Sequence, residues 1–124
     1  MDVRTQRTIS FIKKKKEFDF VFQHARKYVG KYTVVYTILP MNDEENDPHV
    51  HIGIIVSKKT RTSVSRNKIK RRYRHILDEL KNNLRPGSRV ILVARSRIEQ
   101  TGFETLKEDL VRQLSESHTY YEVS

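Results

Sequence analysis

Apolar residues recur at helical spacing in three stretches of the chain. The first stretch has its stripe at i, i+3, i+4 and i+7, formed by Phe18, Val21, Phe22 and Ala25. Phe20 falls on the opposite side of that helix, so packing of the stripe does not account for it. The last stretch has a stripe of Phe103, Leu106, Leu110 and Leu114. Thr101 and Glu104 have the spacing of a capping box at its start.

The middle stretch predicts the longest helix. Ser63 or Ser65 can cap its start, and Arg85-Pro86-Gly87 breaks it after about Asn83. Its apolar stripe consists of Ile69, Tyr73, Ile76, Leu77 and Leu80.

Three runs rich in β-branched and aromatic residues predict strands at 32–39, 50–57 and 88–95. Pro40 ends the first run, and a turn-rich, acidic loop follows at 41–48. The continuous apolar run 50–57 is typical of a strand buried on both faces. Because the long helix connects 50–57 to 88–95, we expect these two strands to be parallel.

The length of 124 residues fits a single domain. We expect residues 1–124 to form one RNA-binding domain. Its fold class should be α/β (α+β). Residues 1–11 should be an extended lead-in, and residues 118–124 should form a frayed tail.

The composition indicates a polyanionic partner. The 25 Lys and Arg outnumber the 15 Asp and Glu, which gives a net charge of +10. A domain this basic usually binds nucleic acid, although such charge can also serve solubility alone. The absence of cysteine excludes disulfides and thiolate metal sites. No apolar run approaches the roughly 20 residues of a membrane span, and no signal-peptide pattern is present, so we expect a cytoplasmic protein.

The long helix carries four cations and one amide within an arc of about 140°. These residues, the basic arc, are Arg66, Asn67, Lys70, Arg71 and Arg74. No acid at i+3 or i+4 lies inside the arc, so its like charges destabilise the helix by roughly a few tenths of a kcal/mol per pair. Lys68, Arg72 and His75 lie on the outer side and can be ordinary solvated residues. A purely structural helix gains nothing from the basic arc, whereas a helix that contacts RNA phosphates does.

The sequence SRNKIKRRYR at 65–74 resembles the R-N-x-x-K-R-x-x-R signature of the bacterial ribonuclease P protein component. Residues 54–59 resemble the second conserved block of that family, and residues 18–22 resemble its F-x-x-V-F helix element. The match covers roughly residues 12–114, in order and at the usual spacing.

This resemblance implies the protein subunit of the ribonucleoprotein that removes the 5′ leader from precursor tRNA. The RNA subunit would be the catalyst, with Mg²⁺ held mainly by that RNA and the substrate, and the protein would contain no catalytic residue. The protein would bind the RNA subunit and the single-stranded leader, without a DNA or membrane partner. The implied fold is a two-layer sandwich with about four strands in a mixed sheet and three helices. Its βαβ crossover would be left-handed, whereas nearly all such crossovers are right-handed.

The resemblance also assigns residues. Its RNA-binding positions are Arg66, Asn67, Lys70, Arg71, Arg74, Ser57, Lys58, Lys59 and Arg61. Its leader-binding cleft comprises Phe18, Phe22 and Tyr36. Judged from the residues alone, aromatic side chains in an apolar helical stripe more often pack in the core than serve as surfaces on which bases stack.

Two other functions remain open from the residues. A structural RNA-binding protein, such as a ribosomal protein, would bind a folded RNA without affecting cleavage of precursor tRNA. A metal-dependent nuclease would need converging carboxylates, and the sequence has no clear set of them. His49 and His51 point to one face of a strand, but two ligands alone make a weak metal site.

Overall fold

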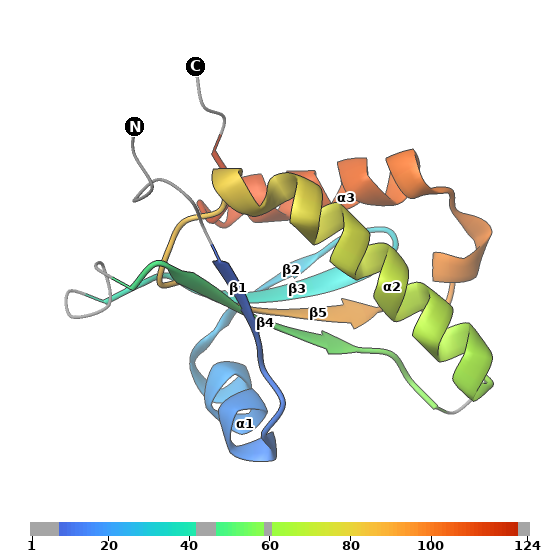
Figure 1. Ribbon diagram of the computed structural model, residues 1–124, viewed down its shortest axis with the longest axis horizontal. Coiled ribbons are helices and arrows are strands. Elements are labelled where there is room, and N and C mark those ends of the chain that lie inside the picture. The colour runs from blue at the N-terminus through green and yellow to red at the C-terminus, as the bar shows by residue number, and fades with distance from the viewer. Residues whose placement is uncertain (1–7, 42–46, 59–60, 122–124) are drawn as a thin grey trace.

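A five-stranded mixed sheet forms the centre of the protein (Figure 1). The computed structural model describes residues 8–41, 47–58 and 61–121. The strands are β1 (Thr8–Phe11), β2 (Arg26–Val29), β3 (Thr33–Ile38), β4 (His49–Ile55) and β5 (Arg89–Ala94), in the order β1-β4-β5-β3-β2. β4 is parallel to β1 and β5, whereas β3 is antiparallel to β5 and β2. The α+β class, the mixed sheet and the parallel β4–β5 pair are confirmed, with five strands rather than about four.

Helices lie on both faces of this sheet. α2 (Ser63–Leu80) and α3 (Phe103–Glu116) lie on one face, and α1 (Lys15–His24) lies on the other (Figure 1). α1 therefore adds a partial third layer to the two that were expected, while the hand of the β4–α2–β5 crossover stays a prediction. The short 3-10 turns η3 (Lys81–Asn83) and η4 (Ile98–Gln100) follow α2 and β5. None of the described helices combines the length and apolar composition that crossing a membrane requires.

The main core lies between the sheet and the pair α2 and α3. All five predicted stripe residues of α2 are buried there, against alternate residues of β4 and β5. Those strand residues are Val50, Ile52, Val90 and Leu92. Burial of one such side chain contributes roughly 1.5–3 kcal/mol. The apolar stripe therefore fixes α2 in place and outweighs the repulsion along its basic arc.

Two short strands and an ordered tail were missed from the sequence. β1 lies within the expected lead-in, and β2 lies in the segment after the first helix, where Arg26 and Lys27 obscure the strand pattern. The prediction of fraying after Ser117 is wrong for residues 118–121. There Leu84 pairs with Tyr120, and the Tyr121 N–H donates to the Asn83 carbonyl.

The predicted caps of α2 and α3 are wrong. Thr62, rather than Ser63 or Ser65, is the N-cap of α2, and its hydroxyl accepts a hydrogen bond from the Ser65 N–H. Gly102 is the N-cap of α3, without a side-chain hydrogen bond. Thr101 instead lies buried just before the helix. The spacing of a capping box is therefore present without its geometry.

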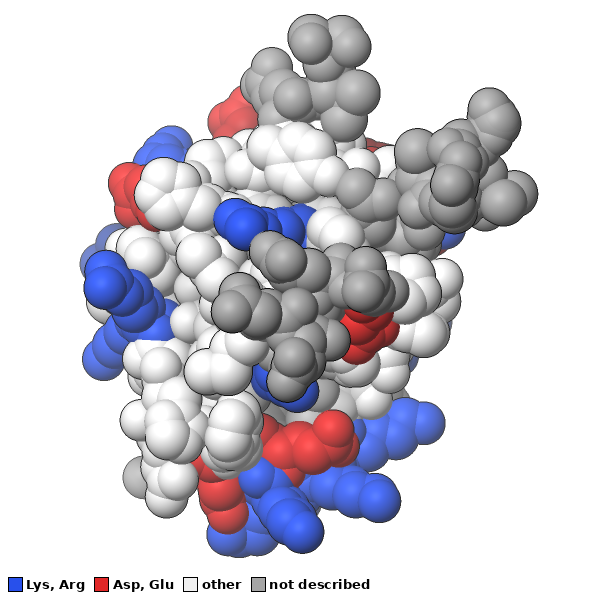
Figure 2. All heavy atoms as spheres, turned by 90° about the vertical axis from the view of Figure 1, so that its left-hand side faces the viewer, with Lys and Arg blue, Asp and Glu red and all other residues white. Residues whose placement is uncertain are grey.

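α1 approaches the sheet at Gly53 of β4. A Cβ at Gly53 would lie 2.5 Å from Cε1 of Phe18, so only glycine leaves room for that ring. Val21 is fully buried next to Phe18, in a small second core with Ile12 and Ile91. Positive side chains gather around α1 with acids between them, at the lower end of the molecule (Figure 2). Gly53 and Phe18 thus determine where this charged helix lies on the sheet.

Asp47 organises the start of β4. Its Oδ1 accepts from the backbone N–H of His49 at 2.9 Å and from the ring Nδ1 of the same residue at 2.9 Å. Its Oδ2 accepts from Nε2 of His51 at 2.8 Å. The hydrogen bond from His51 is the largest influence that lowers the pKa of Asp47, to about 2. The carboxylate therefore stays charged and connects the loop to two residues on one strand face.

We expect Gly53→Ala to destabilise the protein by about 1–3 kcal/mol, because the new methyl group forces the Phe18 ring to move. Urea unfolding measures the effect. Phe18→Leu combined with Gly53→Ala should cost less than the sum of the two single changes, because the smaller side chain leaves room for the methyl group. Strictly additive losses of stability would show that the contact between Phe18 and residue 53 does not cause the destabilisation.

We expect the Asp47 carboxylate to contribute stability that depends on pH. Its pKa is lowered from 3.8 to about 2 on folding, so the contribution is complete above about pH 4 and is lost as the pH falls through that window. The free energy of unfolding should fall more steeply between pH 4 and pH 2 in the wild type than in Asp47→Asn. Asp19→Asn, which removes an exposed acid from α1, is the control. Parallel curves for wild type and Asp47→Asn would rule out this contribution.

Candidate nucleic-acid interface

The basic arc lies along one side of α2. Asn67, Arg71 and Arg74 are exposed, whereas Arg66 and Lys70 are half-buried. Among the described residues, no acid forms an ion pair with any of the four cations. Within the described part of the chain, the charge on this side of the helix is therefore not neutralised by acids.

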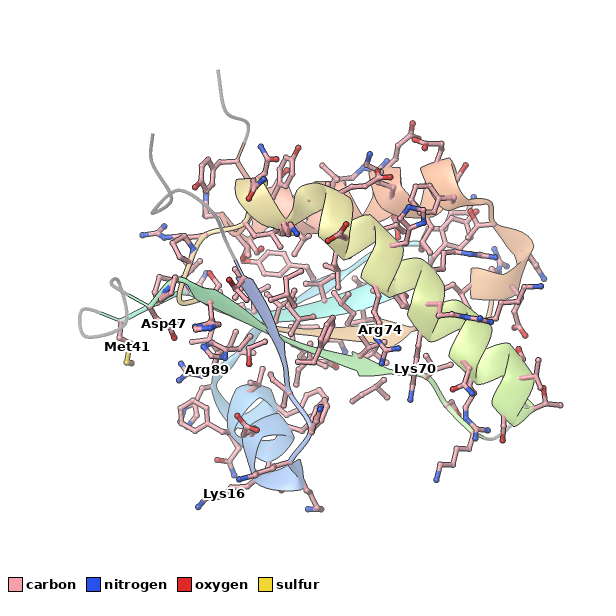
Figure 3. The ribbon with its side chains drawn as sticks, in the orientation of Figure 1. Lys16, Met41, Asp47, Lys70, Arg74 and Arg89 are labelled. Carbon is pink, nitrogen blue, oxygen red and sulfur yellow. The ribbon has the colours of Figure 1, made fainter. Side chains whose placement is uncertain are left out.

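Figure 3 shows Lys70 and Arg74 extending from α2 toward the side of the molecule that carries α1. The guanidinium carbon of Arg74 lies 5.5 Å from the ring centroid of Phe11 in β1. Because a cation over an aromatic face is held by the ring quadrupole, Phe11 helps to orient Arg74. Phe11 was not singled out in the sequence, since its role depends on β1 joining the sheet beside β4.

Arg66 and Arg61 shape the start of α2. Arg66 donates to the carbonyl of Arg61 at 3.1 Å and to the hydroxyl of Ser63 at 3.3 Å. The Arg61 side chain is only 3% exposed and pairs with Glu99 at 3.3 Å. It also donates to the carbonyl of Arg95. Arg61 was predicted to bind RNA, but the structure places it as an internal connection between α2 and the segment after β5.

The outer side of α2 also makes contacts within the fold. Arg72 donates to the carbonyl of Thr101 at 2.9 Å, and the His75 ring lies 4.9 Å from that of Phe103. These contacts attach α2 to the start of α3. Lys68 is exposed and makes no such contact among the described residues, which makes it a suitable reference for the charges of the basic arc.

The three predicted cleft aromatics come together between α1 and the sheet. Phe22 is 41% exposed, and its ring meets that of Tyr36 edge-on, with centroids 4.8 Å apart and planes at 87°. Tyr36 is half-buried, and Phe18 lies half-buried over Gly53. We call these three rings the aromatic groove, after the cleft that the resemblance predicts. Its rings are supported from below by the second core but keep part of their surface in solvent, which suits stacking of bases.

The remaining predicted positions follow β4. Ser57 and Lys58 are both exposed, just beyond the end of the strand at Ile55. Lys59 lies outside the described residues. Ser57 and Lys58 are thus on the segment that connects the sheet to the start of α2.

The two strand histidines do not form a metal centre in the described part of the chain. Both rings contact Asp47, and their centroids lie 6.1 Å apart. No group of three His, Asp or Glu side chains able to hold a metal ion occurs among the described residues. The described residues on this side of the molecule thus offer cationic side chains in the basic arc and partly exposed rings in the aromatic groove.

Comparison with known proteins places this geometry in a family. Residues 7–118 match the Ribonuclease P family. The ribonuclease P protein component of Bacillus mycoides (strain KBAB4) is 38% identical over 100 residues, which are 81% of this chain and 84% of that protein. Its counterpart in Bacillus cereus (strain AH187) is 37% identical with the same coverage.

Solved structures agree with this match. The RNase P protein of Staphylococcus aureus has a TM-score of 0.76 and 26% identity, covering 90% of this chain and 97% of that one. The RNase P protein of Thermotoga maritima has a TM-score of 0.72 over 86% and 96% of the two chains, and at 23% identity it supports the fold alone. From the family match and the similarity to the Bacillus proteins, we conclude that the chain belongs to the ribonuclease P protein family.

Proposed function

We propose that this protein is the subunit of ribonuclease P that binds both the catalytic RNA and the single-stranded 5′ leader of precursor tRNA, and so promotes removal of the leader. The observation that carries the proposal is the presence of two different RNA-binding chemistries on one side of the molecule. Lys70 and Arg74 of the basic arc extend toward the side that carries α1 (Figure 3), and the aromatic groove lies between α1 and the sheet.

The basic arc suits the RNA subunit. Arginine offers a fork of donors that matches two phosphate oxygens, and a helix face with several such groups binds a folded RNA backbone without needing its sequence. Asn67 can both donate to and accept from a sugar or a base edge. Binding through several phosphates should weaken steeply with salt, because counterions are released.

The aromatic groove suits the leader. Bases inside a duplex are stacked on one another, so exposed protein rings recognise unpaired nucleotides. The edge-on arrangement of Phe22 and Tyr36 leaves ring surface for a base, while the sheet beneath fixes their positions. A leader that leaves the body of precursor tRNA as a single strand provides such bases.

The proposal gives the protein no step in bond cleavage. Mg²⁺ would act in the RNA subunit and the substrate, and the described residues of the protein contain no group of three suitable ligands for it. Precursor tRNA and the RNA subunit would be the partners, in the cytoplasm.

We expect Arg71→Ala to weaken binding of the ribonuclease P RNA subunit by about 1–2 kcal/mol, through loss of a charge-assisted contact. Thermal stability should stay the same or rise slightly, since like-charge repulsion within the helix decreases. Filter binding and thermal melting measure the two effects. Lys68→Ala, on the outer side of the same helix, is the matched control. Equal losses for both variants would indicate a general effect of net charge instead of a specific surface.

We expect Phe22→Leu to weaken binding of precursor tRNA to the holoenzyme by about 1–3 kcal/mol when the leader is several nucleotides long. Leucine retains apolar bulk but has no ring face for stacking. With a single leader nucleotide the difference should disappear, and affinity for the RNA subunit alone should be unchanged. An equal loss for both leaders, with a lowered melting temperature, would instead identify Phe22 as a structural residue. Retained binding of a folded RNA with no effect on precursor tRNA would favour the structural RNA-binding alternative.

A further inference from the structure

α1 has a second groove on the flank opposite the aromatic groove. This groove, which we call the Phe20 groove, has a volume of about 450 Å³, within the usual range for small-ligand sites. Ile12 and Val21 form an apolar part of its wall. The polar and aromatic side chains that line it are Lys14, Lys16, Glu17, Phe20, His51 and Arg89. Lys16 and Arg89 lie on the same side of the molecule as Asp47 (Figure 3).

Phe20 is the residue that the helical stripe leaves unexplained. Its side chain is 47% exposed although it lies in the middle of α1. The guanidinium carbon of Arg89 lies 5.7 Å from its ring centroid, and the His24 ring lies 4.6 Å away. An aromatic ring that contacts neighbours yet remains about half exposed is a ready platform for a nucleotide base.

The charges around Phe20 favour a phosphate beside that base. Lys14, Lys16 and Arg89 are cations, while Glu17 is the acid in the wall of the groove. The fifth polar group, His51, is connected through its ring to the Asp47 carboxylate. Because the two lysines outnumber the one acid in the wall, a phosphate is favoured near the lysines. Glu17 disfavours a phosphate at its own edge of the groove, but its carboxylate can accept from an exocyclic amino group of a base.

The Phe20 groove and the aromatic groove flank the same helix on the same sheet face. Arg89 pairs with Ile38, and Ile91 pairs with Tyr36, so the two grooves begin two residues apart along the strands, or about 7 Å. α1 separates them by its own width of about 10 Å. Its outer surface between them includes Lys15, Lys16, Asp19 and Gln23, and Lys15 pairs with Asp19 at 2.9 Å. A single RNA strand that leaves the aromatic groove can therefore cross α1 past Lys16 and reach Phe20.

We infer that the Phe20 groove binds one nucleotide of the leader, a few positions farther from the cleavage site than those in the aromatic groove, with its base stacked on Phe20 and its phosphate near Lys14 and Lys16. This inference rests on the proposed function, since it requires the leader to lie across α1. It adds a second contact point for single-stranded RNA. The central residue of this contact, Phe20, belongs neither to the helical stripe of α1 nor to the basic arc.

Phe20→Leu in the reconstituted holoenzyme tests the inference. Affinity is measured for precursor tRNAs whose leaders lengthen one nucleotide at a time. In the wild type, affinity should rise once when the leader reaches Phe22 and again when it reaches Phe20. Phe20→Leu should remove only the second rise, about tenfold in affinity, and Lys16→Gln should reduce it. Phe22→Leu should remove the first rise.

Tyr121→Leu is the matched control, because Tyr121 is 40% exposed but lies in the C-terminal tail, away from α1. It should reproduce the wild-type curve. If wild-type affinity depends on leader length and Phe20→Leu follows the same curve, the Phe20 groove is not a leader site, while the proposed function stands. If Phe20→Leu weakens binding of the RNA subunit by itself, the nucleotide belongs to that RNA and the leader assignment is overturned. A wild-type affinity that is independent of leader length would overturn both proposals.

Discussion

The arrangement of the side that carries α1 depends on the contact between the Phe18 ring and the backbone of Gly53, which has no side chain. Without a Cβ on Gly53, the ring can lie directly on β4 and bring α1 close to the sheet. Val21 then reaches Ile91 and closes the second core. On one flank the helix presents Phe22 beside Tyr36, and on the other it presents Phe20 beside Arg89. A larger residue at position 53 would shift both flanks together, so this one contact sets the geometry of two grooves.

α2 shows how an unfavourable charge distribution is retained in a stable fold. The five apolar side chains of its stripe are almost completely buried, and Tyr73 donates to or accepts from Thr33 at 2.6 Å inside the core. Burial of the Tyr73 hydroxyl raises its pKa, so it remains a neutral hydrogen-bonding partner. Against this gain, repulsion along the basic arc is small. The core thus lets the helix present cations that no acid of the described residues neutralises, which suits an anionic partner.

Much of the fold and part of the site could be predicted from the sequence, for reasons that differ by element. The periodicity of Ile69 through Leu80 is local information, so both the buried stripe and the basic arc follow from it directly. β2 could not be found in this way, because Arg26 and Lys27 lie on an exposed edge where pairing with β3 outweighs intrinsic preference. The internal role of Arg61 depends on Glu99, which is 38 residues away in sequence. Such long-range partners leave no mark in local spacing.

The two edges of the sheet are both short. β1 and β2 have four residues each, and β2 begins with two cations, while a run of four lysines follows β1 closely. An exposed edge offers unpaired N–H and C=O groups to a strand of another molecule, and short, charged edges discourage that pairing. The positive charge that suits RNA therefore has a second effect at these positions. It should keep free copies of the protein from adding to one another edge to edge, which matters for a basic protein during the interval before it binds a partner.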